Sequence, residues 1–141
     1  MNARDILKYG QQTVLQTLES FPEAWWETPG ACGFWSVKDI IAHLASYERI
    51  LVDILTTFTG GGSTPVLNSY VELGSQFNDI EVSRRTAETI QDVLAEFNDT
   101  HIQVMSLLVN ISSETLRRTD KTHLPTVGPP TSQEAGAFLA R

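Results

Sequence analysis

The sequence is poor in cysteine, in basic residues and in long apolar runs. Cys32 is the only cysteine, so no disulfide can form within the chain and a cytoplasmic location is expected. No stretch of about 18 apolar residues occurs, which argues against a membrane span. Lys and Arg number 10 against 17 Asp and Glu, giving a net charge of −7. An acidic chain lacks the basic surface that nucleic-acid binding requires, so we expect no nucleic-acid partner.

The few basic residues are scattered, and only Arg84-Arg85 and Arg117-Arg118 stand in pairs. We interpret each pair as part of a solvated helix face; a phosphate-binding site is the alternative. The chain has 141 residues, of which 41% are hydrophobic. That length and composition suit one globular domain with a hydrophobic core, so a single domain over residues 1–141 is expected.

Apolar residues recur at helical spacing in the first half of the chain, which predicts an all-α protein. The first predicted helix covers residues 3–21 and stops at Pro22, because proline cannot continue a helix. The second begins after Ser36 and runs to about residue 58. Ser36 is a good N-cap, and Asp39 stands three residues later, where a short acid can reach back to the cap.

The second half of the chain is predicted to hold one long helix and one short one. Residues 59–77 form a long connection that begins TGGGSTP and includes a turn of helix around Tyr70. A third helix is predicted over residues 78–109, and a short fourth segment starts near Ser132. Together these segments predict a helical bundle whose fourth helix is short or truncated.

His43 and Glu48 are polar residues on the otherwise apolar second helix. Each residue of a helix advances about 100° around the axis, so His43 lies beside Tyr47 at one edge of the apolar face. Glu48 lies about 140° from His43, at the opposite edge. The two cannot easily share one metal ion, and Glu48 is expected to contact a neighbouring helix or loop. His43 is either a core-edge histidine bonded to a backbone carbonyl or a metal ligand, a common role of neutral imidazole.

The same reasoning places His101 in the apolar stripe of the third helix. His101 is either a satisfied core histidine or a second ligand that shares an ion with His43 across the core. The tryptophans before the second helix either close one end of the bundle or form the wall of a pocket. In the second case Trp35, Tyr47 and Glu48 are expected to line that pocket.

The stretch WSVKDIIAHLASYE, from Trp35 to Glu48, resembles the signature of the DinB-like superfamily of DNA-damage-inducible proteins and thiol-dependent transferases. The pattern is a Trp-Ser pair at a helix start, then a histidine, then a glutamate. The resemblance extends upstream to LESFPEAWWETPG and downstream to FND and LLVNISSETL, and so covers nearly the whole chain.

The resemblance implies a four-helix bundle that holds a divalent metal, often zinc or nickel, on three histidines. One of these matches His43. The other two form an H-x-x-x-H pair on the fourth helix, a spacing that lets both imidazoles converge on one ion. This sequence has no such pair, and His101 has no counterpart in the motif. We expect TSQEAGAFLAR to be the first half of the fourth helix, with the missing histidines beyond Arg141 in the parent gene.

Two functions follow as expectations. The first is a metal-dependent enzyme, in which the metal activates a low-molecular-weight thiol or water against a small-molecule substrate. Such an enzyme would be inactive in this form if two of its three ligands are missing. The second is a non-catalytic bundle that serves as a binding or assembly module in a stress response. A homodimer is also expected, because a short fourth helix leaves apolar stripes uncovered.

Overall fold

The computed structural model describes residues 2–112 and residue 115. Its α-helices are α1 (Ala3–Glu19), α2 (Val37–Phe58), α3 (Pro65–Leu73), α4 (Phe77–Arg84) and α5 (Ile90–Val109). Single 3₁₀ turns cover Glu23–Trp25 and Gly74–Gln76. Within this part of the chain no β-strand forms, and the predicted all-α class is confirmed.

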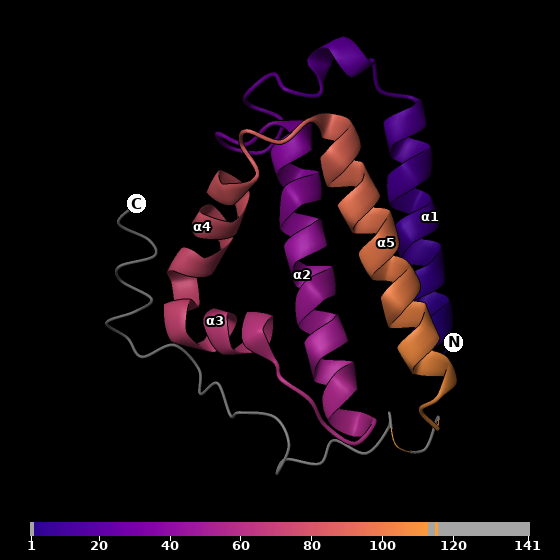
Figure 1. The fold of residues 1–141 in the computed structure, drawn as a ribbon. Helices are drawn as coiled ribbons and strands as arrows, with labels where there is room; N and C mark the ends of the chain where they lie inside the picture. The colour runs from indigo at the N-terminus through magenta and orange to yellow at the C-terminus, as the bar shows by residue number, and fades with distance from the viewer. Residues whose placement is uncertain (1, 113–114, 116–141) are drawn as a thin grey trace.

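Helices α2 and α5 form the centre of the bundle and run side by side in the same direction (Figure 1). Parallel neighbours need a long return connection, and the segment α3–α4 supplies it by leading the chain back along the other side of α2. Helix α1 runs antiparallel to α5 and packs against it. Helix α2 therefore has α5 on one side and α3 with α4 on the other.

The start of α2 follows the capping chemistry that its sequence predicts. The Ser36 hydroxyl accepts a hydrogen bond from the Asp39 backbone N–H at 3.1 Å. The Asp39 carboxylate accepts one from the Ser36 backbone N–H at 3.0 Å. This reciprocal capping box satisfies two otherwise unpaired donors and fixes where the helix begins. The position of His43 along α2 follows from that start.

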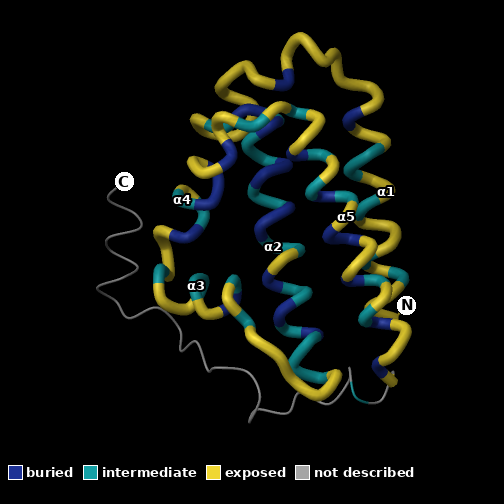
Figure 2. The backbone as a smooth tube through the Cα atoms, in the orientation of Figure 1, coloured by how far each residue is buried: buried dark blue, intermediate teal, exposed yellow. Residues whose placement is uncertain are grey.

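The hydrophobic core lies mainly along the faces of α2 and α5 that meet. Ala45 of α2 and Val104 of α5 are both 0% exposed. On the other side of α2, Phe77 of α4 is also 0% exposed and packs with Ile50 and Leu67. Helix α1 contributes only Leu18 to the buried residues, and most of its length is exposed (Figure 2).

The prediction of one helix over residues 78–109 is wrong, because a turn separates α4 from α5. Helix α4 ends at Arg84, and a new N-cap starts α5: the Thr89 hydroxyl accepts from the Asp92 backbone N–H at 3.1 Å. A capping threonine favours a helix start over a helix interior. The helical turn expected around Tyr70 is longer than predicted and forms the whole of α3.

The predicted fourth segment near Ser132 lies outside the described residues, as do Arg117 and Arg118. None of the described helices is long and apolar enough to cross a membrane.

Candidate functional site

His43 lies in a row of aromatic side chains on the side of α2 that faces α3 and α4. Its ring centroid is 5.2 Å from the ring of Trp35 and 4.6 Å from the ring of Tyr47. The prediction that His43 lies beside Tyr47 is confirmed. The imidazole is thus held between two rings, one from the residue before the capping box and one from the next turn of the helix.

The Nδ1 atom of His43 is buried and has no hydrogen-bond partner in the described part of the chain. Buried polar atoms in folded proteins are normally paired. The interpretation of His43 as a histidine satisfied by a backbone carbonyl therefore has no support at Nδ1. Burial also lowers the pKa of His43 below its ordinary value, which keeps the ring neutral at physiological pH.

Tyr47 continues the aromatic row toward α3 and α4. Its ring is 6.0 Å from that of Tyr70 and 6.2 Å from that of Phe77, in edge-to-face arrangements. Such arrangements are favourable for aromatic pairs. Burial raises the pKa of Tyr47, and Tyr70 raises it further. The phenol is therefore a neutral hydrogen-bonding group beside His43.

Glu48 and His101 meet on the other side of α2, against α5. The Oε1 atom of Glu48 is 3.5 Å from Nδ1 of His101, with side chains 13% and 7% exposed. At that distance the contact is electrostatic, and His101 Nδ1 and Glu48 Oε2 both lack a hydrogen-bond partner among the described residues. Burial raises the pKa of Glu48, and His101 offsets part of that rise. The expected contact of Glu48 with a neighbouring helix is observed, and His101 is buried as predicted.

The structure thus divides the predicted site residues into two groups. Trp35, His43 and Tyr47 lie together, whereas Glu48 lies with His101. Within residues 2–112 and 115, no group of three or more His, Cys, Asp or Glu side chains could hold a metal ion. The described residues therefore do not build a complete metal centre of the kind that the resemblance implies.

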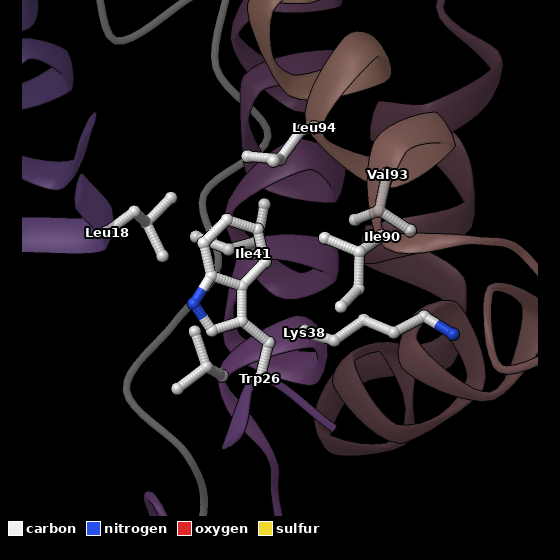
Figure 3. Close-up of a pocket in the computed structure, with 8 residues that line it drawn as sticks. Leu18, Trp26, Lys38, Ile41, Ile90, Val93 and Leu94 are labelled. Carbon is white, nitrogen blue, oxygen red and sulfur yellow. The ribbon is translucent and has the colours of Figure 1, made fainter. Parts of the chain in front are cut away.

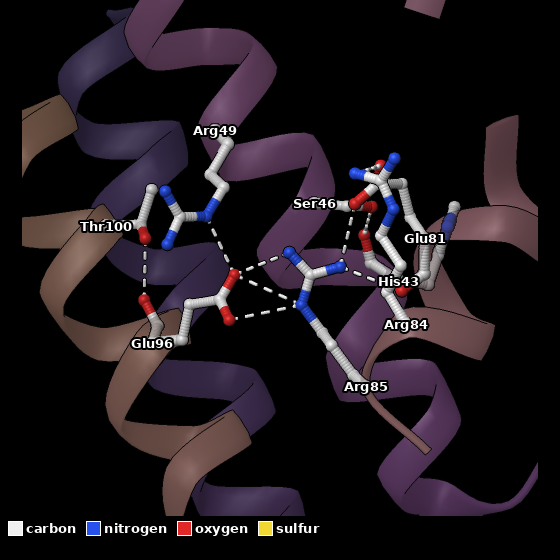
Figure 4. A network of polar contacts seen from close by, with 8 residues as sticks. All are labelled: His43, Ser46, Arg49, Glu81, Arg84, Arg85, Glu96 and Thr100. Carbon is white, nitrogen blue, oxygen red and sulfur yellow. Dashed lines mark hydrogen bonds and ion pairs between the residues drawn. The ribbon is translucent and has the colours of Figure 1, made fainter. Parts of the chain in front are cut away.

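A buried ion-pair network between α2, α4 and α5 escaped the sequence analysis (Figure 4). Arg85 is at its centre, with a side chain that is 8% exposed. It donates from Nη1 to Glu81 at 2.9 Å and from Nη2 to Glu96 at 2.6 Å. The expectation that Arg84 and Arg85 share a solvated helix face holds for Arg84 alone, because Arg84 is exposed and Arg85 is buried. The two glutamates compensate the buried charge of Arg85.

The pKa values of the network follow from these contacts. Burial opposes the charge of Arg85, but hydrogen bonds to Glu96 and Glu81 outweigh it and raise the pKa. Burial also opposes the charge of Glu96, but hydrogen bonds from Arg85 and Arg49 outweigh it and lower the pKa. One local signal in the sequence concerns part of this network: Glu81 and Arg85 stand four residues apart, a spacing that lets two side chains on a helix pair.

The prediction that the tryptophans before α2 close one end of the bundle holds for Trp26 alone, because Trp25 is 59% exposed and Trp35 packs on His43. Trp26 is buried and packs beside Leu18 of α1 and Ile41 of α2 around a small apolar cavity (Figure 3). Lys38 reaches out of this cavity to the Thr86 backbone carbonyl at 3.0 Å. The cavity is lined almost entirely by apolar atoms and belongs to the hydrophobic core.

Comparison with known proteins bears on the family. No curated protein and no solved structure matches the chain significantly. The sequence model of the DinB superfamily, in contrast, matches residues 6–141, which is nearly the whole chain. This match agrees with the helical bundle described above and with the Trp35-to-Glu48 pattern on α2. The chain therefore belongs to the DinB superfamily.

Proposed function

We propose that the protein is a metal-dependent enzyme of the thiol S-transferase or hydrolase type, in which His43 supplies one ligand to a divalent metal ion such as zinc or nickel. The observation that supports this role is the buried Nδ1 of His43, which lacks a hydrogen-bond partner among the described residues. A metal ion would satisfy that atom. The lowered pKa of His43 favours the neutral imidazole, which is the form that binds metals.

The described residues supply one such ligand and not a complete centre. A catalytic zinc site usually has three protein ligands and an open fourth position. His101 is turned toward Glu48, and His123 lies outside the described residues. We therefore derive no catalytic step from His43 alone. A bound metal would lower the pKa of a thiol or of water, and Trp35 and Tyr47 would fix the orientation of the imidazole.

A non-catalytic binding or assembly module is the second candidate. The observation that favours it is the lack, within residues 2–112 and 115, of any group of three side chains able to hold a metal. In this case the aromatic row around His43 would bind a small molecule or a partner without metal. A role in a stress response and the use of a low-molecular-weight thiol as nucleophile remain predictions.

Metal titration separates the two candidates. We expect calorimetry with Zn²⁺ and Ni²⁺ to show one site that weakens at least about tenfold in His43→Ala, because tenfold corresponds to about 1.4 kcal/mol and a metal ligand contributes more than that. His101→Gln is the matched control, a buried histidine on the neighbouring helix, and should bind as the wild type does. No binding by the wild type, or equal binding by His43→Ala, would favour the non-catalytic module.

We also propose that the protein is a cytoplasmic homodimer. Apolar side chains are exposed on α1 and α5: Ile6 is 56% exposed, Ile102 is 62% exposed and Val109 is 63% exposed. A second copy of the chain is a partner that is always present to cover such residues. Light scattering at tens of micromolar should give about twice the chain mass of 15.6 kDa. A mass of one chain at that concentration would refute the dimer.

A further inference from the structure

A surface groove of about 520 Å³ lies beside the ion-pair network. Its lining includes Arg49 of α2, Ser69 of α3 and Arg84 of α4, together with the buried Arg85 and the half-buried Glu88. None of these residues belongs to the aromatic row around His43. The groove thus brings guanidinium groups from α2 and α4 to one place on a protein that is acidic overall.

Every carboxylate oxygen of the network accepts a hydrogen bond from an arginine. Glu81 accepts from Arg85 with Oε2 at 2.9 Å and from Arg84 with Oε1 at 3.1 Å. Glu96 accepts from Arg85 with both oxygens and from Arg49 with Oε1 at 2.8 Å. Because both carboxylates are bonded to the buried Arg85, they are held in place. Each of them in turn holds one exposed arginine at the groove.

The two exposed arginines keep most of their donors. Arg49 uses Nε for Glu96, and Arg84 uses Nη1 for Glu81, whereas a guanidinium carries five N–H donors. Their side chains are 47% and 65% exposed, so the unused donors are open to a ligand. An arginine that is already held loses less conformational freedom when it binds an anion, which favours affinity.

We propose that this groove binds a small molecule bearing a carboxylate or phosphate group, with Arg49 and Arg84 as the two arms of a clamp and the Ser69 hydroxyl as a further donor. Guanidinium groups suit both oxyanions because their paired N–H groups match two oxygens at once. The proposal concerns a site separate from His43 and does not depend on the metal.

The charges at the groove predict which residues help and which oppose binding. The network holds three arginines and two glutamates, which leaves one positive charge. Glu88 lines the same groove and cancels that charge. An incoming anion is therefore attracted by Arg49 and Arg84 and repelled by Glu88, so substitutions on the two sides of this balance should change affinity in opposite directions.

The test is a titration followed by NMR amide shifts, with inorganic phosphate and succinate as probes and sodium chloride at matched ionic strength as the control salt. We expect at least one probe to shift amides around the groove by more than sodium chloride does. Arg84→Gln should weaken that binding by about threefold to tenfold, the range of an exposed charged contact. Arg4→Gln on α1 removes the same charge away from the groove and should leave binding unchanged.

Glu88→Gln should tighten binding, whereas Glu72→Gln, an exposed acid on α3 outside the groove, should not. Binding by phosphate alone would assign the ligand class to phosphates, and binding by succinate alone to carboxylates. The proposal is overturned if neither probe exceeds sodium chloride, or if each variant behaves like its matched control. Arg49→Gln serves as a second test of the clamp if Arg84→Gln changes the fold.

Discussion

Replacing Arg85 by methionine should destabilise the fold strongly, whereas the same replacement of its neighbour Arg84 should not. Both arginines bond to Glu81, but the Arg85 side chain is 8% exposed and that of Arg84 is 65% exposed. Breaking a buried ion pair from one side costs about 3–5 kcal/mol, because it leaves a buried charge without compensation. An exposed pair contributes about 0–1 kcal/mol.

The expected cost for Arg85→Met is at the lower end of that range, about 3 kcal/mol. Glu81 would keep its bond from Arg84, and Glu96 would keep its bond from Arg49. Urea unfolding followed by circular dichroism measures the difference. With a typical slope of about 1.5 kcal/mol per molar urea, the midpoint should fall by about 2 M for Arg85→Met. It should fall by less than about 0.7 M for Arg84→Met.

The pH dependence provides a second readout. The lowered pKa of Glu96 means that its stabilisation is present above the ordinary glutamate pKa and is lost as pH falls through the folded-state value. The wild type should therefore lose more stability on acidification than Arg85→Met does. Equal midpoints for Arg84→Met and Arg85→Met, or an unchanged acid profile, would refute the network as a buried tie between the helices.

Two further substitutions test other parts of the structure. Glu48→Gln should make the protein more stable at neutral pH. Because the pKa of Glu48 is raised, its contribution to stability is present at low pH and is lost as pH rises through the folded-state pKa, whereas glutamine does not ionise and so avoids this loss of stability. A thermal melt at pH 7 that shows Glu48→Gln less stable than the wild type would contradict this prediction. Ser36→Ala should lower the free energy of unfolding measured in urea by about 1 kcal/mol, because it removes the Ser36 hydroxyl that accepts from the Asp39 backbone N–H. A change near zero would show that this cap does not fix the start of α2.

Much of the fold could be predicted because it depends on local chemistry. Ser36 and Asp39 define the start of α2 by hydrogen bonds over three residues. Pro22 predicted an end of the first helix close to the observed one, since α1 ends at Glu19. Local patterns also place His43 beside Tyr47, since residues four apart share a helix face. The split between α4 and α5 was missed, although Thr89 and Asp92 carried a local capping signal and Ala87 is the only apolar residue between Val82 and Ile90.

The pairs of Glu81 with Arg84 and Arg85 are local, but the ion pairs that reach Glu96 of α5 and the groove could not be predicted from the sequence, because they join residues of different helices. Arg49 and Glu96 are separated by 47 positions, and only the packing of α2 against α5 brings them together. The different burial of Arg84 and Arg85 could not be predicted from the sequence either. The two residues look alike in the sequence, yet the end of α4 turns one outward and the other into the protein.

The most direct test of the role proposed for His43 is nitrogen NMR of its imidazole while Zn²⁺ is added. The chain has three histidines, so each can be assigned by a single substitution. We predict that the Nδ1 resonance of His43 shifts as one equivalent of zinc is added, because this buried atom has no partner among the described residues. The resonances of His101, which faces Glu48, should stay in place. A His43 resonance that does not move while zinc binds would contradict the account.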